Sequence, residues 1–306
     1  MTWVLVRKLL RDIRVAWIVV AVLLFLFQIL WARITMRVTI EIFPALVKAN
    51  VTPDLIMQLL MRQNEEGQSQ EMLGQMVQAI IGGERIDLTQ SNDLMTVGYV
   101  HPLMLTVLGI WALGRAANAI AGEIDRGTME LLLAQPIRRA QVVLAHLLVD
   151  AIVLPSLCFC MWIGTYCGTW WMGLQDNENV LQRVDPTRFL PGLLFVVAMM
   201  FAISGVTMWI SAMGRSRARV WGWAVTIFLS MFLINILGQI FWPEVFEWVR
   251  PFTVYFHYHP QMMILDDGWR NNTDGWLHLA ALIGTGAGGY GLAWGTFCYR
   301  DLPAPL

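Results

Sequence analysis

Six apolar stretches of about twenty residues constrain the fold of this chain more than any other feature of its sequence. A helix of about twenty residues crosses roughly 30 Å of hydrocarbon, and a helix satisfies its own backbone hydrogen bonds in lipid. The stretches cover residues 15–32, 96–114, 141–168, 190–213, 220–242 and 276–299. The sequence therefore predicts an all-α integral membrane protein with six transmembrane helices, a single domain over residues 1–306.

The composition also indicates that lipid surrounds the chain. Of the 306 residues, 57% are hydrophobic and 14% are charged, whereas soluble proteins carry roughly 25% charged residues. The formal net charge is −1, so no basic surplus favours a nucleic-acid partner. These figures exclude a soluble enzyme and predict a multi-pass protein of the cell membrane, which in a bacterium is the inner membrane.

The distribution of basic residues between the connections predicts the orientation of the chain. With the N-terminus inside, the inner connections hold 12 of the 21 Lys and Arg residues; the inner side has a net charge of +6 when Asp150 of the third span is counted with it, and the outer side a net charge of −7. Both termini are therefore expected in the cytoplasm. Residues 1–14 are basic and amphipathic, and we expect either a cytoplasmic interfacial helix or a simple positive-inside signal.

Two longer connections fall on the outer side. Residues 35–95 carry two apolar stripes at helical spacing and are expected to form an outer helical segment. Residues 243–275 form a second outer segment, in which His257, His259, Asp266 and Asp267 raise the possibility of a metal site. Aromatic residues between the histidines are typical of the membrane interface, so we expect no metal there.

The inner connection between the second and third spans is the most informative segment. It contains GEIDRGTMELLLAQPIRR from residue 122. Gly127 is expected to break the helix that continues from the second span across residues 96–121, and Thr128 to cap a short new helix with Glu130 in its first turn. Pro136 ends the segment before the third span.

This cytoplasmic coupling segment, residues 115–140, has two interpretations. Its acids, arginines and leucine cluster suit docking in a groove of a soluble partner, and an ordinary connector with its leucines on the bilayer is the alternative. The candidate contact residues are Glu123, Arg126, Gly127, Thr128, Glu130, Leu131, Leu132, Leu133, Pro136 and Arg138.

The stretch EIDRGTMELLLAQPIRR resembles the cytoplasmic signature of ABC-2-type permeases, the membrane subunits of one class of ABC exporters. The six spans, the stretch PFTVYFHYHPQMMI from Pro251 and the ending FCYRDLPAP extend this resemblance. The pattern is most similar to permeases of nitrous-oxide-reductase maturation and of sodium extrusion. The resemblance implies an ABC-2 exporter-like fold and a homodimer that binds two copies of a separate ATPase through the coupling segment.

The chain is expected to be a transport subunit and not an enzyme. It contains no GxxxxGK[ST] phosphate loop, so ATP and Mg are expected on the partner ATPase, with no cofactor in this chain. A first alternative is a mechanotransmitter that acts on an extracytoplasmic partner without moving solute. A second is a membrane-embedded metalloenzyme using His257, His259 and Asp266. Nothing in the spans selects a substrate.

Two further groups lie inside the spans. His146 and Asp150 share one face of the third span, and similar permeases often carry Lys where His146 stands. We expect a buried, hydrogen-bonded His146 and treat Asp150 as a functional candidate. Small residues on one face of the sixth span predict close helix packing, within one subunit or between two; they are Gly284, Gly288, Gly291 and Gly295.

Overall fold

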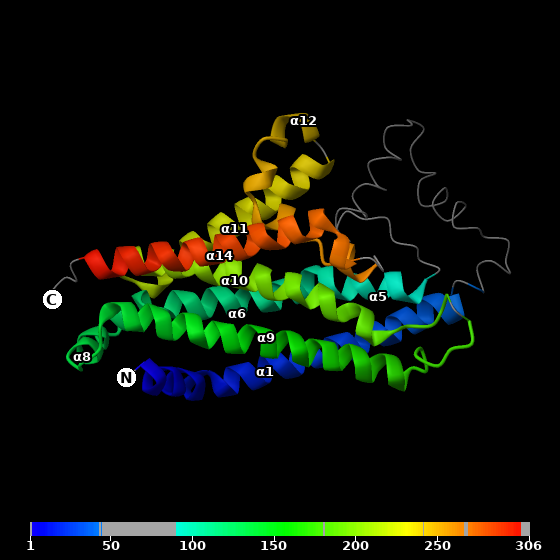
Figure 1. The fold of residues 1–306 in the computed structure, drawn as a ribbon, viewed down its shortest axis with the longest axis horizontal. Coiled ribbons are helices and arrows are strands. Elements are labelled where there is room, and N and C mark those ends of the chain that lie inside the picture. Colours follow the sequence, from blue (N-terminus) through cyan, green and yellow to red (C-terminus); the bar gives the residue numbers. More distant parts are fainter. Residues whose placement is uncertain are drawn as a thin grey trace.

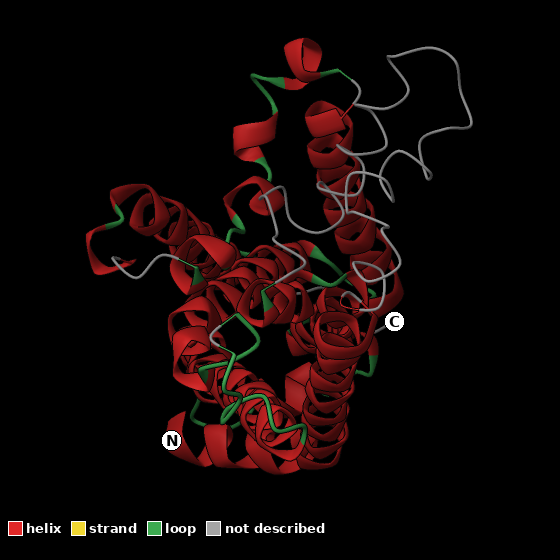
Figure 2. Cartoon of the chain, turned by 90° about the vertical axis from the view of Figure 1, so that its right-hand side faces the viewer, coloured by secondary structure: helices red, strands yellow, loops and turns green. Residues whose placement is uncertain are grey.

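The computed structural model of the chain describes residues 2–42, 44, 90–179, 181–240, 242–265 and 269–300. Within these ranges it contains helices and turns and no strand, as the sequence predicts (Figures 1 and 2). The long helices lie side by side in an elongated bundle, which Figure 2 shows nearly end-on. The stripes expected at residues 55–60 and 72–81 lie outside the described residues.

Helices of very different lengths follow one another along the chain. In order, they are α1 (Thr2–Met36), η1 (Arg37–Ile42), α5 (Ser91–Val100), α6 (Pro102–Ala119), α7 (Ala121–Asp125), α8 (Met129–Leu133), α9 (Arg139–Trp171), η2 (Pro186–Phe189), α10 (Leu190–Met213), α11 (Arg217–Ile240), α12 (Pro243–Phe246), η3 (Arg250–Phe252), η4 (Val254–His257), α13 (Gln261–Ile264), η5 (Trp269–Asn271) and α14 (Thr273–Tyr299).

Five helical stretches in the described part are long and apolar enough to cross a membrane, which makes the chain a multi-pass membrane protein. They are Thr2–Ile42, Ser91–Ala119, Arg139–Trp171, Pro186–Met213 and Arg217–Gln239. The sixth expected span, α14, has 27 residues, about 40 Å at the usual rise. It is not among the five, because its many glycines lower its mean hydropathy.

Two helices differ from the expectation. Residues 2–14 continue into the first span without a break, as one helix, α1. The second span begins at Ser91 and is interrupted at His101, so the continuous helix expected across residues 96–121 is wrong. Pro102 disfavours helical backbone at the residue before it, and His101 has an extended ψ of 132°.

Glycines allow the closest contact in the bundle, between α10 and α14. A Cβ at Gly205 would collide with the carbonyl oxygen of Gly286, and a Cβ at Gly289 would collide with the backbone of Gly205. Only residues without a side chain permit such an approach of two backbones. The glycine face expected from the sequence points elsewhere, since no described atom lies within 4 Å of the Cβ position of Gly284, Gly288, Gly291 or Gly295.

The start of α1, the end of α14 and the short helix α8 lie at one end of the bundle, and α5 lies at the other (Figure 1). The two ends of the described chain therefore share a side with the α7–α8 segment.

Candidate functional site: the α7–α8 segment and the buried ion pair

The α7–α8 segment is a tight helical turn that follows α6 at the end of the bundle (Figure 1). Gly127 joins the two helices with a φ of 68°, in the left-handed region that favours glycine. The helix break expected at Gly127 is therefore confirmed. Thr128 occupies the N-cap position of α8, but its side chain does not cap that helix.

The hydroxyl of Thr128 contacts Glu123 instead. It donates to Glu123 Oε2 at 2.5 Å, and the guanidinium of Arg126 forms an ion pair with the other oxygen of the same carboxylate. Glu123 thus holds the turn around Gly127 closed. Both oxygens of its carboxylate are paired within the segment.

The three leucines of α8, expected from the sequence to form one cluster, divide between the core and the surface. Leu132 and Leu133 pack against the core of this chain, and Met129 is buried beside them. Leu131 is 71% exposed, and Glu130 next to it is also exposed. A partner that covers α8 would therefore meet Leu131 first. Pro136 and Arg138 lie exposed in the link to α9.

Ser211 anchors the α7–α8 segment to α10. Its Oγ accepts hydrogen bonds from the backbone N–H groups of Ile120, at 3.3 Å, and Ala121, at 3.0 Å, and donates to the carbonyl of Ala117 at 3.1 Å. The hydroxyl satisfies two backbone donors at the start of α7 and a carbonyl near the end of α6, groups that helix ends leave without a helical partner. This residue was not predicted from the sequence, although a serine in an apolar span was a visible signal.

A buried ion pair joins three of the long helices below this segment. Arg115 on α6 pairs with Asp150 on α9, with the two side chains 7% and 0% exposed. The hydroxyl of Tyr290 on α14 donates to the same Asp150 oxygen. Arg115 also lies 3.3 Å from His146 Nδ1 and donates to the His146 carbonyl. His146 is therefore buried and hydrogen-bonded, as expected.

Arg115 differs from its expected place. It was counted as a charge of the inner connection when the orientation was predicted, but it lies inside α6 and its charge is neutralised by Asp150. Asp150 was a candidate from the sequence, whereas both of its partners were missed. The available signals were a lone arginine after an apolar run and a tyrosine among the glycines of α14.

Two more arginines, Arg139 and Arg300, donate hydrogen bonds to carbonyl groups at the same end of the bundle. Arg139 donates to the carbonyl of Phe297 at 3.4 Å and to that of Arg300. Arg300 donates to the carbonyls of Ala212, at 2.7 Å, and Gly214, at 3.0 Å. Each cation therefore lies at the C-terminal end of a neighbouring helix, where the helix dipole favours positive charge.

The outer histidines form a hydrogen-bonded cluster. His257 Nε2 lies 2.8 Å from the carbonyl oxygen of Pro251, to which it must donate, and its Nδ1 lies 2.9 Å from Nδ1 of His278. Both nitrogens of His257 are thus occupied. No group of metal-ligating residues suited to an ion occurs among the described residues, and Asp266 and Asp267 lie outside them.

Comparison with known proteins adds a family to this architecture. Searches of curated proteins and of solved structures found no match. The family model described as ABC-2 family transporter protein matches residues 3–265, a range that includes the α7–α8 segment. Because the match covers most of its length, the chain belongs to the ABC-2 transporter family.

Proposed function

We propose that this chain is the permease subunit of an ATP-driven exporter. It crosses the bacterial inner membrane six times, with both termini in the cytoplasm, and forms the substrate pathway as a homodimer. Two copies of a separate ATPase bind ATP and Mg and engage the α7–α8 segment. Family membership supports an association with an ATPase subunit, and the proposal extends it to the contact, the copy numbers and the direction of transport.

The observation that carries this proposal is the exposed apolar side chain of Leu131 on a segment that is bound firmly to the spans. Burying a leucine side chain contributes about 1.5–3 kcal/mol, whereas an exposed ion pair contributes roughly 0–1 kcal/mol. Movement of α8 passes to α6 through α7 and to α10 through Ser211. The buried pair then connects α6 with α9 and α14.

Two features support α14 as the sixth span. It is long enough to cross the hydrocarbon, and it packs along α10, itself one of the five apolar spans, through Gly286 and Gly289. Six crossings also agree with the position of the start of α1 and the end of α14 at the same end of the bundle (Figure 1).

The test is copurification of the ATPase with Leu131→Asp. A carboxylate at the centre of the contact should reduce the ATPase recovered by at least tenfold, with the permease still folded. Trp248→Asp is the matched control, because Trp248 is 83% exposed but lies in the outer segment; it should recover the ATPase like the wild type. Leu132→Asp should also lower the yield of folded permease, since Leu132 packs on the core.

Undiminished ATPase recovery with folded Leu131→Asp would reject α8 as the contact. Glu123→Gln separates assembly from coupling: it weakens the brace to Arg126 and Thr128 without touching Leu131. We expect it to keep the ATPase bound and to lower hydrolysis stimulated through the permease.

A mechanotransmitter is the second candidate, and one observation favours it. The outer segment exposes large apolar side chains at Val245, Trp248 and Phe252, which suit an extracytoplasmic partner. The complex in sealed vesicles distinguishes the two functions. ATP hydrolysis without movement of any candidate solute, together with binding of an outer partner, would replace the exporter by the mechanotransmitter.

A further inference from the structure

A cavity of about 590 Å³ lies between α6, α11 and the outer segment. Its walls run from Pro102 to Leu113 on α6 and from Trp221 to Gln239 on α11, a length of about 27 Å along α11. Its volume is within the range of roughly 300–1,000 Å³ that takes a single small ligand.

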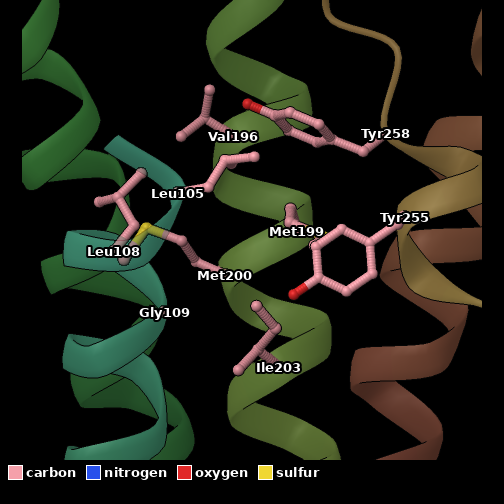
Figure 3. A pocket seen from close by; sticks show the side chains of 9 residues that line it. All are labelled: Leu105, Leu108, Gly109, Val196, Met199, Met200, Ile203, Tyr255 and Tyr258. Carbon is pink, nitrogen blue, oxygen red and sulfur yellow. The ribbon is translucent and has the colours of Figure 1, made fainter. Parts of the chain in front are cut away.

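The cavity continues toward a smaller pocket against α10, which Figure 3 shows. Tyr255 and Tyr258 reach into that pocket from the outer segment, facing Met199 on α10, while Leu105 and Gly109 line it from α6. These two tyrosines and these two α6 residues line both spaces.

The wall of the larger cavity has two distinct parts. Most of its length is apolar, with Leu105, Ile110, Leu113, Val225, Phe228 and Leu229. Its polar side chains gather at the outer end, where Asn235, Gln239, Arg250 and His259 line it. The cavity is therefore amphipathic along its length.

Three of these polar side chains carry buried atoms without a hydrogen-bond partner among the described residues. The atoms are Asn235 Oδ1, Arg250 Nε and His259 Nδ1. Buried polar atoms are nearly always paired in folded proteins. Such atoms also occur elsewhere, for example Arg115 Nε and Asp150 Oδ1, so the argument for a bound molecule is the grouping of these three on one cavity wall beside an unpaired charge.

Arg250 is half-buried and has no described counter-ion. No carboxylate in the described ranges forms an ion pair with it. Its guanidinium donates to the carbonyl of Gly238 at 3.5 Å and lies 5.5 Å from the centre of the Phe256 ring. A Cβ at Gly238 would lie 2.5 Å from Arg250 Cδ, so the glycine makes room for the arginine stem. Guanidinium groups bind carboxylate and phosphate oxygens in bidentate geometry.

We propose that this cavity binds a single-chain amphiphile whose head group combines an anionic oxygen with a hydroxyl. The anionic oxygen pairs with Arg250, the hydroxyl donates to Asn235 Oδ1, and the apolar chain lies between α6 and α11. The inference that an amphiphile binds depends only on the cavity. The inference that this amphiphile is the transported substrate rests on the proposed function.

The experiment measures binding to the full-length protein in a neutral detergent, with lysophosphatidylglycerol as the probe. Two further compounds are compared with it. Monoacylglycerol with the same chain lacks the charge, and free glycerol phosphate lacks the chain. We expect lysophosphatidylglycerol to bind at least tenfold tighter than monoacylglycerol, and glycerol phosphate not to compete at equal concentration. Arg250→Gln should reduce the first affinity to that of monoacylglycerol.

Gly109→Leu tests the apolar part independently of the charge. Gly109 lines the cavity, and no described atom lies within 4 Å of its Cβ position, so a leucine there fills the space without a clash at Cβ. It should abolish binding of both acyl probes. Gly291→Leu is the matched control, because the Cβ position of Gly291 is equally open but lies on α14, away from this wall; its binding should equal that of the wild type.

Equal affinity for the charged and neutral acyl probes, or unchanged binding in Arg250→Gln or Gly109→Leu, would overturn this inference. So would competition by glycerol phosphate alone, which would indicate a simple anion site. If Arg250→Gln fails to fold, Gly109→Leu and the two acyl probes still decide the question. ATPase recovery is measured on the same preparations. If the permease recovers the ATPase but binds no amphiphile, this inference alone is rejected. If it binds the amphiphile but recovers no ATPase, the proposed function alone is rejected.

Discussion

Arg115 and Arg250 carry the same charged group within one helical protein and have opposite surroundings. Arg115 lies between α6 and α9 and forms an ion pair with Asp150, with Tyr290 on the same carboxylate. Arg250 lies beside a cavity with an aromatic ring and a carbonyl as its neighbours and no carboxylate among the described residues. A buried cation with its counter-ion holds helices together. The cation without one, Arg250, is the residue to which our proposal assigns a ligand.

The comparison extends to the uncharged groups around each arginine. At the inner end, Ser211 satisfies backbone donors of the α6–α7 turn, and Arg139 and Arg300 satisfy carbonyls at helix ends. At the outer end, Asn235 and His259 keep polar atoms without a described partner. Arg115 Nε and Asp150 Oδ1 also lack a described hydrogen-bond partner, so the two arginine sites differ in the pairing of their charges and not in how completely their other polar atoms are satisfied.

The largest expected effect is the loss of folded protein in Asp150→Ala. This change leaves Arg115 buried without a counter-ion, and breaking a buried pair by removing one partner costs about 3–5 kcal/mol. Thermal unfolding in detergent should show a large drop in the midpoint, while Asp125→Ala, at an exposed acid, should leave it unchanged. The double variant Arg115→Met with Asp150→Leu should regain most of the lost stability. If the double variant is as unstable as Asp150→Ala, unpaired charge is not the cause.

A smaller effect is expected from Ser211→Ala. It leaves the N–H groups of Ile120 and Ala121 without their acceptor, and an unsatisfied buried donor costs about 1–3 kcal/mol. Hydrogen exchange should accelerate in residues 120–128 more than elsewhere. Ser216→Ala, in the short connection between α10 and α11, is the matched control. Uniform exchange in both variants would contradict the role of Ser211 as an anchor.

The smallest effect concerns pH and the outer end. Burial lowers the pKa of His259 to about 4 from its usual 6.5, and the neighbouring His278, His257 and Arg250 add to this shift. The folded state therefore resists protonation, and stability should be constant above about pH 7 and fall between pH 6.5 and pH 4. At pH 5.5 the loss is about 1 kcal/mol, from 1.36 kcal/mol per pKa unit.

His259→Phe should flatten this dependence, as measured by unfolding midpoints from pH 7.5 to pH 5. His101→Phe replaces a histidine that does not line the cavity. In this variant the unfolding midpoint should keep the whole pH dependence that we assign to His259. An unchanged slope in His259→Phe would assign the pH dependence to other groups.

Long, uninterrupted apolar runs made most of the helices predictable. The span expected at residues 190–213 coincides with α10, and Gly127 breaks the inner segment as its position indicated. The break at His101 was also readable from Pro102 but was overlooked. In these cases the information is local, because a run, a glycine or a proline acts on its own stretch of backbone.

The features that were missed depend on tertiary packing. α14 contains two sets of glycines, one of Gly284, Gly288, Gly291 and Gly295 and the other of Gly286 and Gly289. Only the packing against α10 reveals that the second set forms the contact. Tyr290 lies 140 residues from Asp150 in the sequence, so no local pattern joins them. The cavity is defined by space between α6, α11 and the outer segment, and empty space leaves no trace in composition or periodicity.

The position of the ion pair along the chain bears on how this protein enters the membrane. Arg115 and Asp150 lie on consecutive spans joined by the short α7–α8 segment, so both charges are synthesised close together. Each alone is costly in hydrocarbon, but an inserting hairpin of α6 and α9 presents them to the lipid as a neutral pair. Tyr290 joins only after the last helix is made. The counter-ions of the pair therefore both lie in the part of the chain that is made before α10, α11 and α14.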